Sequence, residues 1–175
     1  MIWGGEDMEL TDVLSKEEWK QLAEEIYEKF GINGGVNDKQ GLIVAFSSQW
    51  SNEFCPKIKG GEQSRTICAT AHQYLLKEAQ EKKEAAIGEC DVGFSKFVVP
   101  VFYKGEFLGT AGGCGFLEED GEVDTFYMAK VLNLDEKEIE GKLAQIKKLS
   151  PSELKEAIEY VKKRIEQILQ AYTGC

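Results

Sequence analysis

FSKFVVPVFYKGEFLGTA, residues 94–111, is the stretch that decides the fold class of this 175-residue chain. Residues 94–103 are rich in Phe and Val, which favour strands, and Lys104-Gly105 predicts a tight turn into a second strand over 106–111. Pro100 lacks a backbone N–H, so it predicts an edge or a bulge within the first strand. The stretch therefore predicts an antiparallel hairpin.

The residues before this hairpin predict a helix, a second hairpin and another helix. Ser15, followed three residues later by a glutamate, forms a capping box, and Gly31 is placed to end the helix that starts there. Residues 32–36 and 42–46 are typical of strands joined by a turn-rich connection. After an irregular segment, helix is expected from near residue 62 to about residue 86.

The residues after residue 111 are mostly helical in pattern. Helices are expected over 123–132 and 136–148, and Ser150 and Pro151 mark the start of a longer one. Its apolar residues alternate by four and three: Leu154, Ile158, Val161, Ile165, Ile168 and Tyr172. This seam predicts either packing on the sheet or a parallel helix pair in a homodimer. Two hairpins without βαβ crossovers predict an α+β fold with an antiparallel sheet and flanking helices.

Composition and charge narrow the class of protein. The chain is 42% hydrophobic, enough for one domain with a substantial core, and its net charge is −10. Nucleic-acid binding relies on Lys and Arg, and no basic stripe occurs, so no nucleic acid is expected as partner. No apolar run of membrane-spanning length and no secretory signal occur, so a cytoplasmic location with reduced thiols is expected.

A glycine-rich run follows the hairpin, with four glycines within residues 109–115. The phosphate-loop ending and the Rossmann spacing are both absent. Two interpretations stay open: a backbone that a ligand approaches closely, or a strand packed against another backbone.

Four cysteines lie beside expected turns or element ends: Cys55, Cys68, Cys90 and Cys114. His72, the only histidine, follows Cys68 by four residues, so both side chains are expected on one side of a helix. Thiolates with an imidazole suit zinc, and three or four thiolates suit an iron–sulfur cluster. No Cys-x-x-Cys pair supports a metal centre, however, so redox-active or pocket-lining thiols and ordinary buried cysteines remain alternatives.

The chain resembles the PocR-type sensory domain, a PAS-like ligand-binding module. The matching features are Phe54-Cys55, Arg65 and Cys68, Cys90-Asp91-Val92-Gly93-Phe94, Val99-Pro100-Val101 and Lys104-Gly105-Glu106-Phe107-Leu108-Gly109. The similarity covers roughly residues 19–134, and the C-terminal helix is expected to be included. It implies a PAS-like sheet, sensing of small molecules such as diols, and a shared role for three of the cysteines.

The resemblance also sets the expected domain organisation: an N-terminal tail over 1–14, the sensory domain over 15–149 and a C-terminal amphipathic helix over 150–175. Two departures from the family stand out. The chain has Cys114-Gly115-Phe116 where the family tends to have Gly-Gln, and nothing after residue 149 exceeds a single helix.

The sequence thus predicts a sensor that binds a small molecule, a Cys-ligated metal centre, or both, and signals to a partner protein. The expected ligand-binding residues, for which plain core packing is the alternative, are Trp50, Phe54, Phe94, Phe97, Gly112, Gly113 and Phe116. A redox-sensing thiol protein is the second hypothesis. Catalysis is not expected, because no nucleophile signature or acid–base pair can be picked out.

Overall fold

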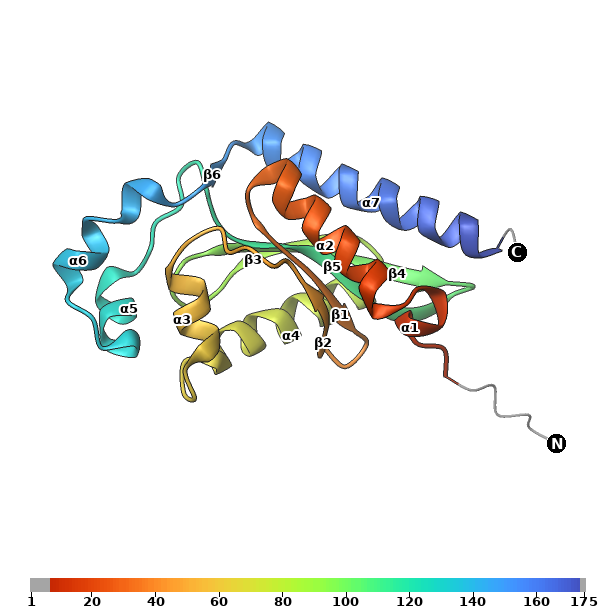
Figure 1. The fold of residues 1–175 in the computed structure, drawn as a ribbon, viewed down its shortest axis with the longest axis horizontal. Coiled ribbons are helices and arrows are strands. Elements are labelled where there is room, and N and C mark those ends of the chain that lie inside the picture. The colour runs from red at the N-terminus through yellow and green to blue at the C-terminus, as the bar shows by residue number, and fades with distance from the viewer. Residues whose placement is uncertain (1–6, 174–175) are drawn as a thin grey trace.

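Residues 7–173 are described by a computed structural model of the chain, which has an α+β architecture (Figure 1). The helices are α1 (Leu10–Val13), α2 (Lys16–Phe30), α3 (Phe54–Gly60), α4 (Arg65–Lys82), α5 (Thr125–Leu132), α6 (Glu136–Glu140) and α7 (Pro151–Thr173), with a 3-10 turn at Leu143–Gln145. The strands are β1 (Asn33–Asp38), β2 (Ile43–Phe46), β3 (Ala86–Glu89), β4 (Ser95–Tyr103), β5 (Glu106–Glu118) and β6 (Lys148–Leu149).

The first five strands form an antiparallel sheet in the order β2-β1-β5-β4-β3, and β6 adds a short parallel pairing to β5. The predicted hairpin is β4–β5, and its turn residues Lys104 and Gly105 have φ angles of 48° and 81°. Pro100 lies beyond Val98, the last β4 residue paired with β3, so β4 is an edge strand there. The α+β fold with flanking helices, consistent with a PAS-like domain, is therefore confirmed.

One face of the sheet is covered by α2 and α7, which lie side by side above it in Figure 1. Ser15 caps α2 with the predicted capping box, and Gly31 ends it in the left-handed conformation. The apolar face of α2 and alternate residues of β4 and β5 form the main core, with Trp19 and Phe97 fully buried. Large side chains thus fill this side of the sheet.

The apolar residues that form the seam of α7 pack against the core of the same chain. Leu154, Ile158, Val161, Ile165 and Ile168 are buried in the main core, and Tyr172 packs edge-on against Tyr103 with ring centroids 5.3 Å apart. Glu25 of α2 also accepts hydrogen bonds from Arg164 and Tyr160 of α7, at 2.8 Å and 3.0 Å. Packing on the sheet is therefore the arrangement of this helix, and homodimerisation stays a prediction.

Four short elements differ from the expected pattern. Residues 10–13 of the expected tail form α1, whose Leu10 and Val13 are buried in the core. The segment expected to be irregular contains α3, and β3 occupies residues 86–89, where the helix was expected to end. The helix expected over 136–148 ends at Glu140 and is followed by the 3-10 turn, and residues 148–149 pair with β5 as β6. β6 depends on a strand far away in the chain, β5, and α1 depends on its contact with α7, neither of which local propensity reports.

A second apolar cluster fills one end of the molecule, where α3, α5 and α6 gather (Figure 1). Phe54, Val92 and Met128 are buried at its centre. Within residues 7–173, no helix is both long and apolar enough to cross a membrane.

Candidate functional site

The face of the sheet opposite α2 and α7 carries a cavity of about 480 Å³, which lies between the strands and α4 (Figure 1). This volume lies within the range of small-molecule sites. Three rows of residues from β1, β5 and β4 form its floor, because side chains of a strand alternate between the two faces. The cavity exists because this face lacks the large apolar residues that fill the other one.

The row order follows from the strand register. The first row is Asn33, Cys114 and Lys96, the second is Gly35, Gly112 and Val98, and the third is Asn37, Thr110 and Pro100. All of these except Pro100 line the cavity. The middle row has two glycines side by side, so it is hollow. A Cβ at Gly112 would lie 2.0 Å from the carbonyl oxygen of Phe97, so only glycine allows this approach of β5 and β4.

The roof is the N-terminal half of α4. Cys68, Ala69 and His72 face the cavity, while the C-terminal half is anchored through Leu75 and Ala79, which are buried with β3 and β4. Helical spacing of three and four explains why Cys68 and His72 share one side, as the sequence predicts. One half of this helix is thus packed and the other half spans the cavity.

The β1–β2 turn closes one end of the cavity. Gly41 has a φ of 88°, and a Cβ there would lie 3.4 Å from the His72 ring and 2.3 Å from Gln73 Nε2. Gln73 Nε2 in turn donates a hydrogen bond of 2.7 Å to the carbonyl oxygen of Gln40. The turn and α4 are therefore in direct contact beside His72.

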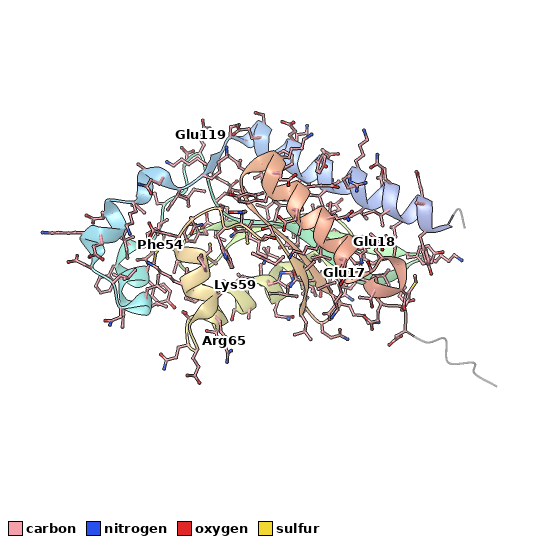
Figure 2. The ribbon with its side chains drawn as sticks, viewed as in Figure 1. Glu17, Glu18, Phe54, Lys59, Arg65 and Glu119 are labelled. Atoms are coloured by element: carbon pink, nitrogen blue, oxygen red, sulfur yellow. The ribbon has the colours of Figure 1, made fainter. Side chains whose placement is uncertain are left out.

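The α3–α4 corner forms another wall, and Figure 2 labels Lys59 and Arg65 there. The ammonium of Lys59 lies over the ring of Phe46, 4.2 Å from its centroid. Trp50 packs on the same ring at a centroid distance of 5.0 Å. The wall thus combines aromatic surface with positive charge.

Burial controls the electrostatics of the cavity. The pKa of His72 is lowered to about 3, by burial first and then by the positive charges of Lys96 and Lys59. Burial also lowers the pKa of Lys96, and the like charge of Lys59 acts in the same direction, while Cys114 opposes them. The imidazole is therefore neutral at pH 7, with one donor and one acceptor nitrogen.

Several buried polar atoms of the cavity have no partner among the described residues. Both ring nitrogens of His72 and the hydroxyl of Thr110 make no hydrogen bond, although these residues are only 4% and 1% exposed. Unpaired buried polar groups cost free energy, and such groups concentrate where a ligand or water completes them. The cavity therefore has unused hydrogen-bonding capacity.

The predicted ligand-binding residues divide into two groups. Phe97, Gly112 and Gly113 line the cavity. The other four lie outside its lining: Trp50, Phe54 and Phe94 belong to the cluster around α3, and Phe116 belongs to the main core, as does Phe97.

The predicted metal or thiol residues lie around the floor and the α3–α4 corner. Cys68, Cys114 and His72 line the cavity, Cys55 is buried on α3, and Cys90 packs against the same cluster as Cys55. Burial raises the pKa of Cys55, and the neighbouring cysteines Cys114, Cys68 and Cys90 raise it further. The four thiols are therefore close enough to interact electrostatically.

Burial favours the neutral form of Cys55, Cys68 and Cys90 by raising the pKa of each thiol. Burial raises the pKa of Cys68 to about 11, and burial also raises the pKa of Cys90. Within the part of the chain that is described, no group of three or more His, Cys, Asp or Glu side chains is placed to hold a metal ion. The metal centre thus gains no support from the arrangement and stays a prediction.

Lys96, Lys59, Thr110 and Asn33 are cavity residues that the sequence reasoning missed. Lys96 had a signal: it is the only charged residue in the apolar run of residues 94–103, FSKFVVPVFY. Lysine is rarely buried unless its charge is paired, so a lysine inside an apolar strand indicates a partner for its charge. Asn33 and Thr110 had no such signal, because their burial depends on the register of distant strands.

The family whose model matches the chain is described as the sensory domain found in PocR, and the match covers residues 12–172. It includes residues 19–134, where the sequence resemblance was placed, and nearly all of α7, the C-terminal helix that was expected to belong to the match. No curated protein matches the chain.

Proposed function

Because the chain belongs to the PocR sensory-domain family, we propose that it senses a small molecule bound in the cavity between the sheet and α4. The observation that carries this proposal is the hollow sheet face. Gly35 and Gly112 lie side by side on it, and the ring nitrogens of His72 and the hydroxyl of Thr110 have no hydrogen-bond partner among residues 7–173. A ligand that fills the hollow would pair these atoms.

Binding without catalysis is part of the proposal. A Cys–His nucleophile pair requires a hydrogen bond between base and thiol and a lowered thiol pKa. The ring nitrogens of His72 make no hydrogen bond within residues 7–173, and burial raises the pKa of Cys68. The chemistry of the site therefore favours a receptor over an enzyme.

The proposed output runs through a homodimer or a partner signalling protein. Its support is the β1–β2 turn at one end of the cavity, where the lining residues Leu42 and Ile43 are 67% and 56% exposed. A ligand that contacts this turn and α4 together would change the surface that a partner meets. Only a ligand that binds one conformation better can transmit a signal in this way.

A substitution that fills the cavity tests the proposal. Ala69 lies on the roof and is exposed, so Ala69→Trp places an indole in the cavity without disturbing the core. Thr70→Trp, on the neighbouring exposed position outside the lining, is the matched control. The assay is a thermal-shift screen of short diols, alcohols, aldehydes and carboxylates, since a ligand of the native state raises the melting temperature.

We expect at least one compound to stabilise the wild-type protein and Thr70→Trp but not Ala69→Trp. If stabilising compounds act equally on all three proteins, they bind elsewhere and the proposed site is wrong. A screen without any stabilising compound would speak against the ligand-binding function itself.

Thiol-based redox sensing is a second candidate, favoured by the electrostatic proximity of Cys55 to Cys68, Cys90 and Cys114. Its test is the melting temperature under reducing and oxidising conditions, with the metal content of anaerobically purified protein measured in parallel. A redox-dependent shift that Cys68→Ser abolishes would support it. Iron or zinc near one equivalent would instead favour the predicted metal centre, and less than a tenth of an equivalent would exclude it.

A further inference from the structure

The charges of the cavity oppose the charge of the whole chain. The net charge is −10, yet Lys59, Arg65 and Lys96 all line the cavity. Among the described residues, no Asp or Glu belongs to this lining. A concave site with one sign of charge and low-dielectric walls concentrates ligands of the opposite sign.

Among the described cations of the lining, Lys96 is the one on the sheet floor, whereas Arg65 is exposed. The place of Lys96 on β4, paired with Gly88 of β3 on one side and with Cys114 of β5 on the other, puts it on the cavity floor. Within residues 7–173, its ammonium makes no hydrogen bond or ion pair, whereas the ammonium of Lys59 lies over the ring of Phe46. A desolvated charge without a partner is costly, so an anion next to Lys96 would be stabilised strongly.

The other end of the cavity offers neutral hydrogen-bonding groups. Thr110 and His72 border the β1–β2 turn, Thr110 through its pairing with Asn37 and His72 through its contact with Gly41. Along β5, Thr110 and Cys114 are four residues apart, which corresponds to about 13 Å. On the floor, the backbone positions of Lys96 and Thr110 are therefore separated along the cavity, with Val98 and the two glycines between them.

We infer that the cavity binds a small organic carboxylate with an apolar body and a hydroxyl group at its far end. The carboxylate pairs with Lys96, the body lies over the glycines and Val98, and the hydroxyl bonds with His72 and Thr110. The inference rests on the proposed ligand-binding function and names its ligand class. One carboxylate matches the one ammonium that the described lining has on the sheet floor, that of Lys96, and Lys59 and Arg65 at the wall assist its entry.

Matched probes test the inference by isothermal titration calorimetry. The probes are ω-hydroxy acids of four to eight carbons, the diols of the same lengths, and the plain acids without the hydroxyl. We expect the best hydroxy acid to bind the wild-type protein at least tenfold more tightly than its diol. Loss of the hydroxyl should weaken binding about fivefold, since a neutral hydrogen bond contributes less than a charge-assisted one.

Two variants assign these preferences to residues. Lys96→Met removes the charge and should bind acid and diol equally, and Thr110→Val should bind the hydroxy acid no better than the plain acid. Lys130→Met, an exposed lysine of α5 outside the cavity, is the control and should keep both preferences. Lys96→Gln replaces Lys96→Met if circular dichroism shows that the methionine variant is misfolded.

The outcomes separate this inference from the proposed function. Diols that bind as tightly as their acids, or an acid preference that survives in Lys96→Met, would overturn the carboxylate ligand and leave small-molecule sensing intact. Acids that fail to bind would also overturn it. If, in addition, no compound of the wider screen binds, the ligand-binding function is refuted as well.

Discussion

His72 is the residue whose behaviour depends most directly on burial. Its imidazole is 4% exposed, has no hydrogen-bond partner among the described residues and lies close to two positive charges. Its pKa in the folded protein is therefore about 3, below the ordinary value of 6.5. Because it is the only histidine, its titration can be observed without interference from another imidazole.

This pKa predicts a specific pH dependence of stability. As the pH falls below 6.5, the unfolded chain takes up a proton on His72 and the folded chain does not, so stability is lost until the pH approaches 3. The expected slope between pH 6.5 and 5 reaches about 1.4 kcal/mol per pH unit for one fully shifted group. Urea unfolding at half-unit pH steps measures it.

His72→Phe is the control, because it removes the titrating group and keeps an aromatic ring. The slope above pH 5 should then disappear. An unchanged slope in this variant would show that other groups carry the pH dependence, and the buried, neutral imidazole would be the wrong description.

Cys68 provides a second prediction at the residue scale. A pKa of about 11 leaves roughly one thiol in three thousand ionised at pH 7.5, and alkylation requires the thiolate. We expect iodoacetamide to modify Cys68 about a hundredfold more slowly in the folded protein than in urea, as followed by peptide mass spectrometry. Rapid modification of folded protein would indicate an activated thiol and strengthen the redox hypothesis.

At the scale of elements, α7 shows how one amphipathic pattern permits two outcomes. The alternation of its apolar residues fits a coiled-coil partner and a sheet equally well, because both bury one side of the helix. The structure places that side on β4 and β5, and the ion pair between Arg164 and Glu25 attaches α7 to α2 as well. The helix is thus part of the domain core.

The substitution Ile165→Ala tests this packing. Ile165 is 5% exposed in the main core, so its truncation should lower the free energy of unfolding by about 2–5 kcal/mol and leave the molecular mass in solution unchanged. Lys155→Ala, on the exposed side of the same helix, should change stability by less than about 0.5 kcal/mol. Chemical unfolding and light scattering measure the two quantities. A dimer that Ile165→Ala converts into a stable monomer would show that the seam is an interface between subunits.

At the scale of the whole molecule, the distribution of charge is unequal. The surface is strongly acidic in sum, and the cations Lys59, Arg65 and Lys96 are gathered at the cavity. Such a molecule repels polyanions and can still admit a small anion, because screening limits repulsion to about 8 Å at physiological salt. Net charge and local charge therefore predict different classes of partner.

Binding to duplex DNA tests the expectation that follows from the net negative charge. Since binding of the phosphate backbone requires many lysine and arginine contacts, we expect no salt-dependent affinity of the chain for a fluorescein-labelled duplex between 50 and 200 mM salt. Fluorescence anisotropy measures this, with a basic DNA-binding protein as the positive control. Tight binding at 150 mM salt would contradict the charge argument.

The amino-acid sequence by itself determined those features that depend on near neighbours. The β4–β5 hairpin follows from Phe and Val propensity and from Lys104-Gly105, and the ends of α2 follow from Ser15 and Gly31. These signals are local, because turn conformation, capping and the period of apolar residues act within a few positions. These local signals were sufficient to predict the α+β fold class and to reveal the family resemblance.

Only the tertiary structure decided the cavity. Gly35 and Gly112 are distant in the chain and become neighbours through the register of β1 and β5. Lys96 of β4 and His72 of α4 line the same cavity. Whether an aromatic residue such as Phe54 or Phe116 packs in a core or faces a ligand depends on the same long-range pairing. The physical reason is that a one-residue change of register moves every side chain to the other face of the sheet.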